Sequence, residues 1–427
     1  MIKKIVEKIL IWEAKIALAK HKPKIIGITG SVGKSSAKEF ISRVLGSVFV
    51  LRQSPKSYNS EIGLTLSILG LPTYFKNIAG WIKNIAKGFF EIWNKKFPQV
   101  LVLEMGIDRP KDMERLLEIA VPDIAVITAI GEVPVHVEFF SGPEELAKEK
   151  SKILKYLSAE GYAVLNFDDD AVYAMREKTK AHTVSFGFGE HADFRASNFK
   201  SSLEGSTFKV DHEGSFVPSR LKKALGKHNI YSALAAFAVG KIMGLNLVEI
   251  SEYLSLCELP PGRMKLLEGV KNSKIIDDSY NSSPMALHAA LDTLEELESN
   301  LPDGKAGRKI AVLGDMLEIG KYTIEAHKAV GQKARKSADI FIAVGPRSKF
   351  SFEEAVALGF PKDKIFHFST SKEAAIAVKN LIEEGDLVLV KGSQGMRMER
   401  VVEEIMTNPQ DAEKLLVRQD RYWKRKL

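Results

Sequence analysis

A glycine-rich segment near the amino terminus has the residue types of a phosphate-binding loop. It follows an apolar run at Lys24–Thr29 and precedes a helical pattern. Small residues at Gly30 and Gly33 allow backbone N–H groups to converge on phosphate oxygens, and the next helix N-terminus adds a favourable potential. Lys34 could then reach the outer phosphates. We predict that a nucleotide is bound here by Thr29, Gly30, Ser31, Val32, Gly33, Lys34, Ser35 and Ser36.

Two side chains near this loop offer oxygen ligands for a magnesium ion. Ser35 holds the position of the hydroxyl that ligates magnesium in phosphate loops. Glu104 ends the apolar run Val100–Glu104, and a hard cation bound to phosphates needs such an oxygen ligand. On its own, Glu104 is equally consistent with a helix cap or an ion-pair partner. Polar residues also cluster at Gly131–Glu138 and Ala147–Lys150, but their spacing by itself does not indicate a chemical role.

The elements around these residues alternate between short apolar runs and helical stretches. Besides the two runs named above, the runs are Ile124–Ile127, Tyr162–Asn166, Lys274–Asp277, Lys309–Leu313, Ile340–Val344 and Leu387–Val390. This alternation is typical of α/β folds in which helices cover a mainly parallel sheet. Asp193–Val210 instead alternates apolar and polar residues with Gly205 at a turn, which predicts a small antiparallel addition.

A hinge at Leu259–Gly262 divides the chain, because two prolines and a glycine cannot continue a helix or an inner strand. We therefore predict three parts. Residues 1–22 form an amphipathic helix, and residues 23–262 form a central ATP-binding domain around the phosphate loop. Residues 263–427 form a carboxy-terminal doubly wound, Rossmann-like domain.

Two lysine-rich segments carry apolar stripes at helical spacing. Residues 1–20 place on one face Ile2, Ile5, Ile9, Trp12, Ile16 and Ala19. Residues 75–96 likewise align Ile78, Trp81, Ile82, Ile85, Phe89, Ile92 and Trp93. We expect both stripes to pack against the protein itself or a twin subunit. The alternative is a peripheral contact of both segments with an anionic membrane surface.

The overall composition is that of a folded cytoplasmic protein. The single cysteine, Cys257, excludes a disulfide framework within the chain. The formal net charge of +8 attracts anions without choosing among nucleotides, acidic lipids and nucleic acid. Charged residues interrupt the apolar stretch of the amino terminus, so we expect no cleaved leader and no membrane-spanning helix.

Together these segments resemble the Mur ligase family of ATP-dependent amide ligases. The phosphate loop has the form of that family, with Thr29 and Gly30 ahead of a variable pair. The resemblance implies ATP and two Mg²⁺ ions, with His136 helping to bind the second ion. It also implies that Lys150 is carbamylated to a metal-bridging anion. An uncharged amine must form first, and a cationic site that lowers the pKa of Lys150 favours this chemistry.

Further blocks extend the resemblance from Lys24 to Ile405. Asn59 lies in a segment similar to the family's asparagine-rich loop, and is implied as a substrate contact. Asn229 lies in a segment similar to the adenine-binding motif, in which Ser232 replaces a second asparagine. Arg263 is implied to meet the nucleotide phosphates. Asp278 is implied to bind the ribose, and helix capping is its competing interpretation.

Two blocks, Ala311–Gly320 and Val390–Glu399, resemble the dipeptide-adding branch of the family. By analogy, the acceptor-amine site is lined by Asp315, Lys391, Ser393 and Arg397. The implied reaction joins D-alanyl-D-alanine to UDP-N-acetylmuramoyl-tripeptide through an acyl phosphate, in peptidoglycan precursor synthesis. No nucleic-acid partner is expected.

The sequence departs from the family at its amino terminus. Typical members begin with a separate domain that holds the UDP end of the substrate, and only residues 1–22 precede the predicted central domain. Two alternatives therefore stay open. One is a ligase of the same fold with another substrate, such as a pseudomurein or poly-amino-acid precursor. The other is a nucleotide-gated binding protein.

Overall fold

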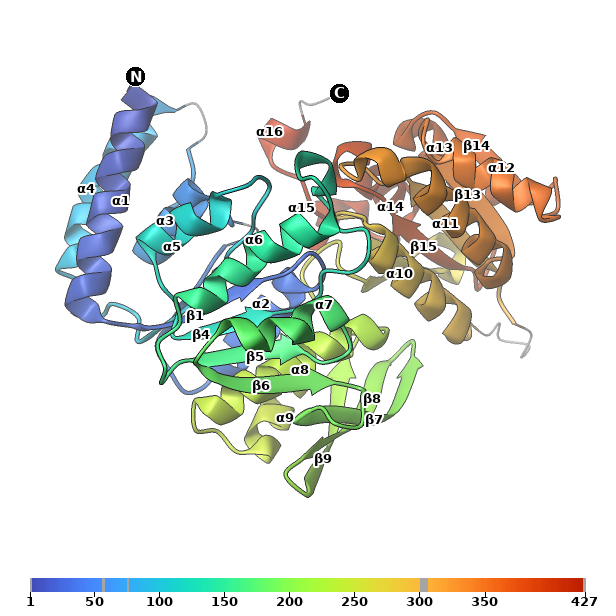
Figure 1. The fold of residues 1–427 in the computed structure, drawn as a ribbon. Helices are drawn as coiled ribbons and strands as arrows, with labels where there is room; N and C mark the ends of the chain where they lie inside the picture. The colour runs from blue at the N-terminus through green and yellow to red at the C-terminus, as the bar shows by residue number, and fades with distance from the viewer. Residues whose placement is uncertain (1, 56–57, 75–76, 300–305, 425–427) are drawn as a thin grey trace.

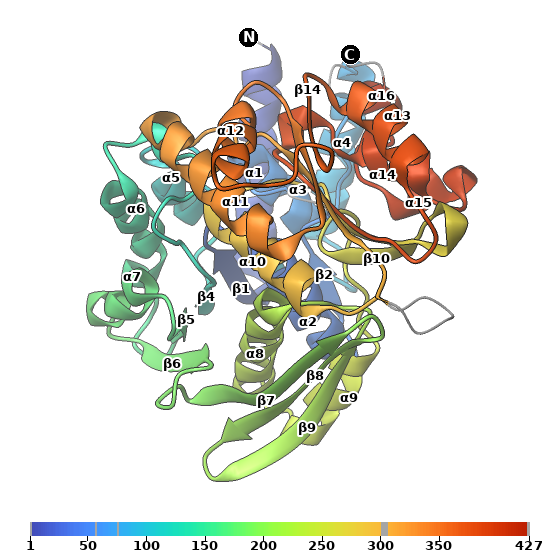
Figure 2. The same ribbon diagram turned by 90° about the vertical axis from the view of Figure 1, so that its right-hand side faces the viewer.

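The structure is a computed structural model that describes residues 2–55, 58–74, 77–299 and 306–424. It contains two sheets, each covered by helices on both faces (Figures 1 and 2). The larger sheet is formed by the first part of the chain and the smaller sheet by the last part. The hinge predicted at Leu259–Gly262 lies between the last helix of the first part and the first strand of the second.

The phosphate-loop strand is central to the larger sheet. This strand, β1 (Lys24–Thr29), pairs in parallel with β3 (Val100–Glu104) and β4 (Ile124–Ile127). The sheet order is β2-β3-β1-β4-β5-β6-β7-β8-β9, in which the other parallel strands are β2 (Leu51–Gln53), β5 (Tyr162–Asn166) and β6 (His182–Gly187). The side chains of the central strands are buried on both faces, as continuous apolar runs predict.

The antiparallel addition is confirmed but larger than predicted. It comprises β7 (Phe194–Ser202), β8 (Gly205–His212) and β9 (Ser215–Lys222). The sequence analysis missed β9, which contains Pro218. Proline cannot donate to a strand ladder and is therefore confined to edge positions, and β9 is the edge strand of this sheet.

The smaller sheet is doubly wound, with the order β10-β11-β15-β12-β13-β14. Its strands are β10 (Lys265–Glu268), β11 (Lys274–Asp278), β12 (Lys309–Gly314), β13 (Ile340–Val344), β14 (Ile365–Phe368) and β15 (Leu387–Lys391). One face is covered by α10 (Pro284–Glu296), α11 (Thr323–Ser337) and α12 (Lys349–Ala357). The other face is covered by α13 (Ser371–Leu381) and α14 (Glu399–Ile405).

Six further helices cover the larger sheet. One face carries α2 (Lys34–Leu45), α8 (Lys227–Ile242) and α9 (Leu247–Ser255). The opposite face carries α3 (Glu61–Leu69), α5 (Asp112–Ile119) and α6 (Pro143–Lys155). From Asn229 to Gly240, α8 is buried at nearly every position, so it shows no amphipathic stripe and is held by apolar packing all round.

The two lysine-rich segments form a pair of helices, α1 (Ile2–His21) and α4 (Ile78–Ile92), at one edge of the molecule (Figure 1). Residues 75 and 76 of the second segment lie outside the described residues, as does Met1. Only part of each predicted apolar stripe packs inward: Ile16 of α1 and Trp81, Ile85 and Ile92 of α4 contact the core. On α1 the buried apolar residues are Val6, Leu10, Ala14 and Ala17, whereas Ile5 and Trp12 are exposed.

Small residues explain the orientation of α4. Its buried positions are Gly80, Asn84, Gly88 and Ile92. A methyl group on Gly88 would overlap the carboxylate of Glu13 on α1, so only glycine permits this close approach. Four large apolar side chains of α4 remain exposed beside this contact, namely Ile78, Ile82, Phe89 and Trp93.

Within the described residues, no helix is long and apolar enough to cross a membrane. Cys257 is buried, as expected, and burial raises the pKa of its thiol to about 12. The thiol is therefore protonated near neutral pH.

The carboxyl group of Glu13 generates a prediction about stability. Glu13 is 2 % exposed, its Oε2 atom lacks a hydrogen-bond partner, and burial raises its pKa from 4.5 to about 7. The folded protein therefore binds this proton more tightly than the unfolded chain, so stability falls as pH rises from 4.5 through 7. Glu13→Gln should remove this loss and stabilise the protein by up to about 3 kcal/mol at pH 8.

Thermal unfolding followed across pH 4 to 8 measures the effect, with the exposed residue Glu118 changed to Gln as the control. The advantage of Glu13→Gln should shrink toward pH 4. An advantage that is the same at every pH would contradict a buried, titrating carboxyl.

Candidate active site

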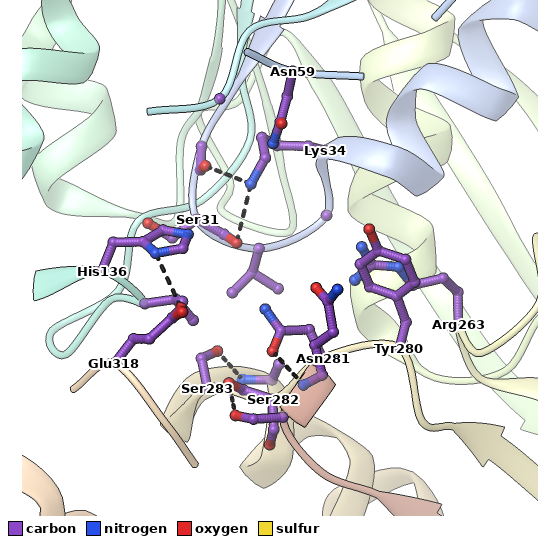
Figure 3. Close-up of a pocket in the computed structure, with 18 of the residues that line it drawn as sticks. Ser31, Lys34, Asn59, His136, Arg263, Tyr280, Asn281, Ser282, Ser283 and Glu318 are labelled. Carbon is purple, nitrogen blue, oxygen red and sulfur yellow. Dashed lines mark hydrogen bonds and ion pairs between the residues drawn. The ribbon is translucent and has the colours of Figure 1, made fainter. Parts of the chain in front are cut away.

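A cavity of about 400 Å³ lies between the two sheets (Figure 3). The larger part of the chain lines it with the phosphate loop, the end of β3 and the segment around His136. The smaller part lines it with residues that follow β11, β12 and β15. Carboxyl ends of parallel strands are where α/β folds bind ligands, so both halves present their binding edges to one space.

The phosphate loop is held in the conformation that its glycines allow. Gly30 and Gly33 have φ values of 140° and 87°, which other residues rarely adopt. The amides of Ser31 and Val32 donate to the carbonyl of Ala129, at 2.6 and 3.1 Å. The donors left for phosphate oxygens are therefore the free N–H groups in the first turn of α2, which begins at Lys34.

Two lysines meet at one carbonyl oxygen of this loop. The Nζ atom of Lys34 donates to Gly30 O at 2.9 Å, and the Nζ atom of Lys150 donates to the same oxygen at 3.0 Å. Burial lowers the pKa of Lys34. Burial, followed by the nearby Lys34 ammonium, lowers the pKa of Lys150 well below its usual range. A bound polyanion would relieve the repulsion between the two amines.

Oxygen ligands for a cation stand beside the loop. Ser35 Oγ donates to Glu104 Oε2 at 3.2 Å, and Glu104 is buried. A hydroxyl and a carboxylate are ligands that Mg²⁺ prefers, so this pair fits the predicted first ion. No group of three or more His, Cys, Asp or Glu side chains within the described part of the chain could hold a metal. That is consistent with Mg²⁺, which is commonly bound by few carboxylates together with substrate phosphates.

His136 lies between two carboxylates. Its Nδ1 atom is 3.0 Å from Glu318 Oε2, and its Nε2 atom is 3.4 Å from Asp108 Oδ1. Glu318 belongs to the smaller part of the chain, so this ion pair joins the two halves across the cavity (Figure 3). The contact with His136 lowers the pKa of Glu318. A metal ion at His136 would have to share or replace these contacts.

The smaller part of the chain presents a buried ion pair to the cavity. Lys391 Nζ is 2.6 Å from Asp278 Oδ2 and donates to the carbonyl of Asn281 at 2.9 Å. Asp278 also accepts from the amide of Met264 at 3.2 Å. Ser393 lines the same space and accepts from the amide of Leu317 at 2.8 Å.

Arg263 bridges the halves next to the loop. Its guanidinium donates to Ser35 Oγ at 3.2 Å and lies over the ring of Tyr280, 4.0 Å from the centroid. Asn59 reaches the cavity from the opposite side (Figure 3). The predicted residues brought to this one cavity are thus Gly30, Ser31, Val32, Gly33, Lys34, Ser36, Asn59, Glu104, His136, Lys150, Arg263, Asp278, Lys391 and Ser393.

Five predicted residues do not line this cavity. Thr29 and Ser35 lie directly beside it in the loop. Asn229 is fully buried and donates to the carbonyl of Leu225 at 2.7 Å. Asp315 accepts from the backbone and hydroxyl of Ser348, at 2.7 and 2.8 Å. Arg397 is paired with Glu399 at 2.5 Å. Asp315 and Arg397 thus have structural partners here, and their substrate contacts stay predictions.

Several cavity residues were missed by the sequence analysis. Glu318 lies inside the segment Ala311–Gly320 that the resemblance singled out, and Asn281 lies three residues after Asp278, but no role had been given to either. His228, next to Asn229, is half-buried, and desolvation lowers its pKa to about 4, so its ring is neutral near pH 7. Asp108 had no local signal, because it reaches the cavity only through the fold.

Two family models match the chain. The model of the Mur ligase middle domain matches residues 28–240, and that of the Mur ligase glutamate ligase domain matches residues 262–394. The UDP-N-acetylmuramoyl-tripeptide--D-alanyl-D-alanine ligase of Bacillus subtilis is 30% identical over 399 residues, which are 93% of this chain and 79% of that protein. The enzyme of the same name from Escherichia coli is 26% identical over 392 residues, which are 90% of this chain and 77% of that protein.

Solved structures of similar proteins share the fold. The MurF ligase from Thermotoga maritima, solved in complex with ADP, has a TM-score of 0.75 and 25% identity, and the match covers 96% of this chain and 84% of that one. A pseudomurein peptide ligase type C from Methanothermus fervidus has a TM-score of 0.66 and 18% identity over 91% of this chain and 80% of that one. The second match shows the fold alone.

The position of Arg263 leads to a prediction about nucleotide turnover. Lysine keeps the charge but lacks the planar fork that reaches Ser35 while it lies on Tyr280. Arg263→Lys should therefore slow ATP-dependent phosphate release about 100-fold, the usual effect of losing one preorganised donor. Arg220→Lys, at an exposed ion pair with Glu204, is the matched control and should leave the rate unchanged. A full rate for Arg263→Lys would contradict this role.

Proposed function

This chain belongs to the Mur ligase family, and from that premise we propose that it is an ATP-dependent ligase of the dipeptide-adding kind. It joins D-alanyl-D-alanine to UDP-N-acetylmuramoyl-tripeptide, forms ADP and phosphate, and serves peptidoglycan precursor synthesis in the cytoplasm. The observation that carries this proposal is the meeting of Lys34, Lys150, Arg263 and Glu104 with residues of the second half in one cavity.

The cavity suits phosphoryl transfer followed by acyl transfer. The γ-phosphoryl group passes from ATP to the peptide carboxylate, so the bond between the β-phosphate oxygen and the γ-phosphorus breaks and an acyl phosphate forms with ADP. The dipeptide amine then attacks the acyl carbon, loses a proton, and inorganic phosphate leaves. Neither step needs a protein nucleophile, and the chain contributes position and charge.

Each half of the chain has its own part in this reaction. The first turn of α2, Lys34 and Arg263 hold the phosphates of ATP, and Asp278 and Asn229 hold its ribose and adenine. Lys391 and Ser393, with Asp315 and Arg397 behind them, place the acceptor amine. Asn59 contacts the peptide substrate. A closed cavity excludes water, because water would hydrolyse the acyl phosphate.

Two Mg²⁺ ions complete the proposed site. Ser35 and Glu104 would hold one, and His136 with a carbamylated Lys150 would hold the other. Bound there, the ions would offset phosphate charge as it moves during transfer. Carbamylation forms a bond between the Lys150 Nζ atom and the carbon of CO₂ and releases one proton. The lowered pKa of Lys150 supports it, because the neutral amine is the form that reacts.

Substrate dependence of phosphate release tests the proposed reaction. With ATP and magnesium present, release should require UDP-N-acetylmuramoyl-tripeptide and D-alanyl-D-alanine together, and a pentapeptide product should appear in equal amount. Either compound alone should give background release. If the two compounds fail to stimulate phosphate release even when added together, the chain acts on another substrate. A pseudomurein or poly-amino-acid precursor is then the first candidate.

Chemical rescue tests the modification of Lys150. Lys150→Ala should lower turnover by about 100-fold or more, because an anion that organises the site is lost. Added short carboxylates should restore a measurable part of that activity. Lys152→Ala, which removes the next lysine of α6, at an ion pair with Glu149, serves as the control and should need no rescue. Full activity of Lys150→Ala without additives would refute the role of the modification.

A further inference from the structure

The pair of helices α1 and α4 leaves large apolar side chains in water. Six of them form what we call the outer face: Ile5, Trp12, Ile78, Ile82, Phe89 and Trp93. Each is between 51% and 64% exposed. Exposed apolar residues scattered singly are normal, but a contiguous group marks a surface that meets another phase or molecule.

The register of the two helices shows that these side chains form one surface. The Nζ atom of Lys20 lies 3.4 Å from the centroid of the Trp93 ring, and the ring of His21 stacks on that of Phe97. The carboxyl end of α1 therefore meets the carboxyl end of α4, and the helices run parallel, side by side (Figures 1 and 2).

Helical spacing then fixes the direction of the outer face. On α1, Ile5 and Trp12 stand about a third of a turn from the buried stripe of Val6 and Leu10, at about 100° per residue. They turn toward the side on which Glu13 meets Gly88 of α4. On α4 the exposed apolar residues turn toward α1 by the same reasoning. The exposed apolar residues of α1 and those of α4 therefore lie next to each other, on the solvent side of the contact between the two helices.

Lysines flank this surface on both sides. By the same helical spacing, Lys8 and Lys15 lie beyond the apolar strip at the outer edge of α1, and Lys83 lies beyond it on α4, next to the exposed ring of Phe90. All three lysines are exposed. The three acidic residues of the two helices do not offset this charge on the outer face. Glu13 is buried between the helices, Glu91 is paired with Arg52 at 3.0 Å, and Glu7 lies by helical spacing on the far side of α1 from Ile5 and Trp12.

We propose that the outer face docks on an anionic lipid bilayer, with the helix pair lying in the plane of the interface. Apolar side chains would enter the boundary between head groups and acyl chains, tryptophans would lie at head-group level, and the flanking lysines would meet lipid phosphates. A second copy of the chain is a poorer fit, because two such faces brought together would oppose lysines to lysines. The ligase would then work on the membrane surface.

Vesicle binding by the full chain tests this proposal. The protein should co-sediment with vesicles that contain phosphatidylglycerol and remain in solution with vesicles of phosphatidylcholine alone. Trp12, Trp81 and Trp93 are three of the four tryptophans, so intrinsic fluorescence should shift to shorter wavelength on binding. High salt should weaken the binding, because it screens the lysines.

Substitutions separate the outer face from the rest of the surface. The double variant Trp12→Glu, Phe89→Glu should lose vesicle binding, and each of Lys8→Gln and Lys83→Gln should weaken it about 5-fold. Phe216→Glu, at a residue that is 62% exposed on β9, is the control and should bind like the unaltered protein. All variants should keep the unfolding midpoint, and their phosphate release with dissolved substrates should be unchanged.

Three results would overturn the proposal. One is no binding of the unaltered protein to anionic vesicles, and another is binding that the double variant retains. The third is a dimer in light scattering that the double variant dissociates, which would assign the outer face to a second copy. Failure of the proposed reaction would show as absent substrate-dependent phosphate release in solution, so the two proposals can fail separately.

Discussion

The carbonyl oxygen of Gly30 accepts hydrogen bonds from half-buried Lys34 and buried Lys150, and the site depends on this shared contact. It brings the amines of Lys34 and Lys150 to one point at the end of the central strand. Charging both amines at this distance is unfavourable, which contributes to the lowered pKa of Lys150, and α2 and α6 hold the two side chains together because each helix is anchored in the core. The cavity is thus shaped to receive negative charge.

The two halves of the chain touch across the cavity. Arg263 reaches Ser35, and Glu318 reaches His136. Both contacts use residues that the reaction itself would need. The ion pair of His136 therefore competes with metal binding, and the entry of phosphates and cations would exchange internal contacts for contacts to substrate. Such an exchange couples closure of the cavity to the presence of its ligands.

The sequence predicted the central strands well, because their residues are buried on both faces and read as uninterrupted apolar runs. It missed β2, β6, β10 and β14, whose residues are partly exposed. It also located the phosphate loop, Glu104 and Arg263, whose chemistry depends on local spacing. It did not predict the ion pair of His136, because Glu318 and Asp108 approach it only after both sheets have formed. Asn229 was assigned to a ligand from its motif, yet its amide is engaged with the backbone at Leu225. The orientation of α1 and α4 was missed since periodicity identifies an apolar stripe but not what covers it.

In the helix pair α1 and α4, the residues that stabilise the fold differ from the residues that form the outer face. Gly88 allows the helices to approach, and small or medium side chains of α1 complete the packing. The large apolar side chains contribute little to this packing. Substitutions such as Ile82→Val or Phe89→Leu could therefore alter what the surface adheres to while the fold is unchanged. Surface affinity and conformational stability can accordingly vary independently in this part of the chain.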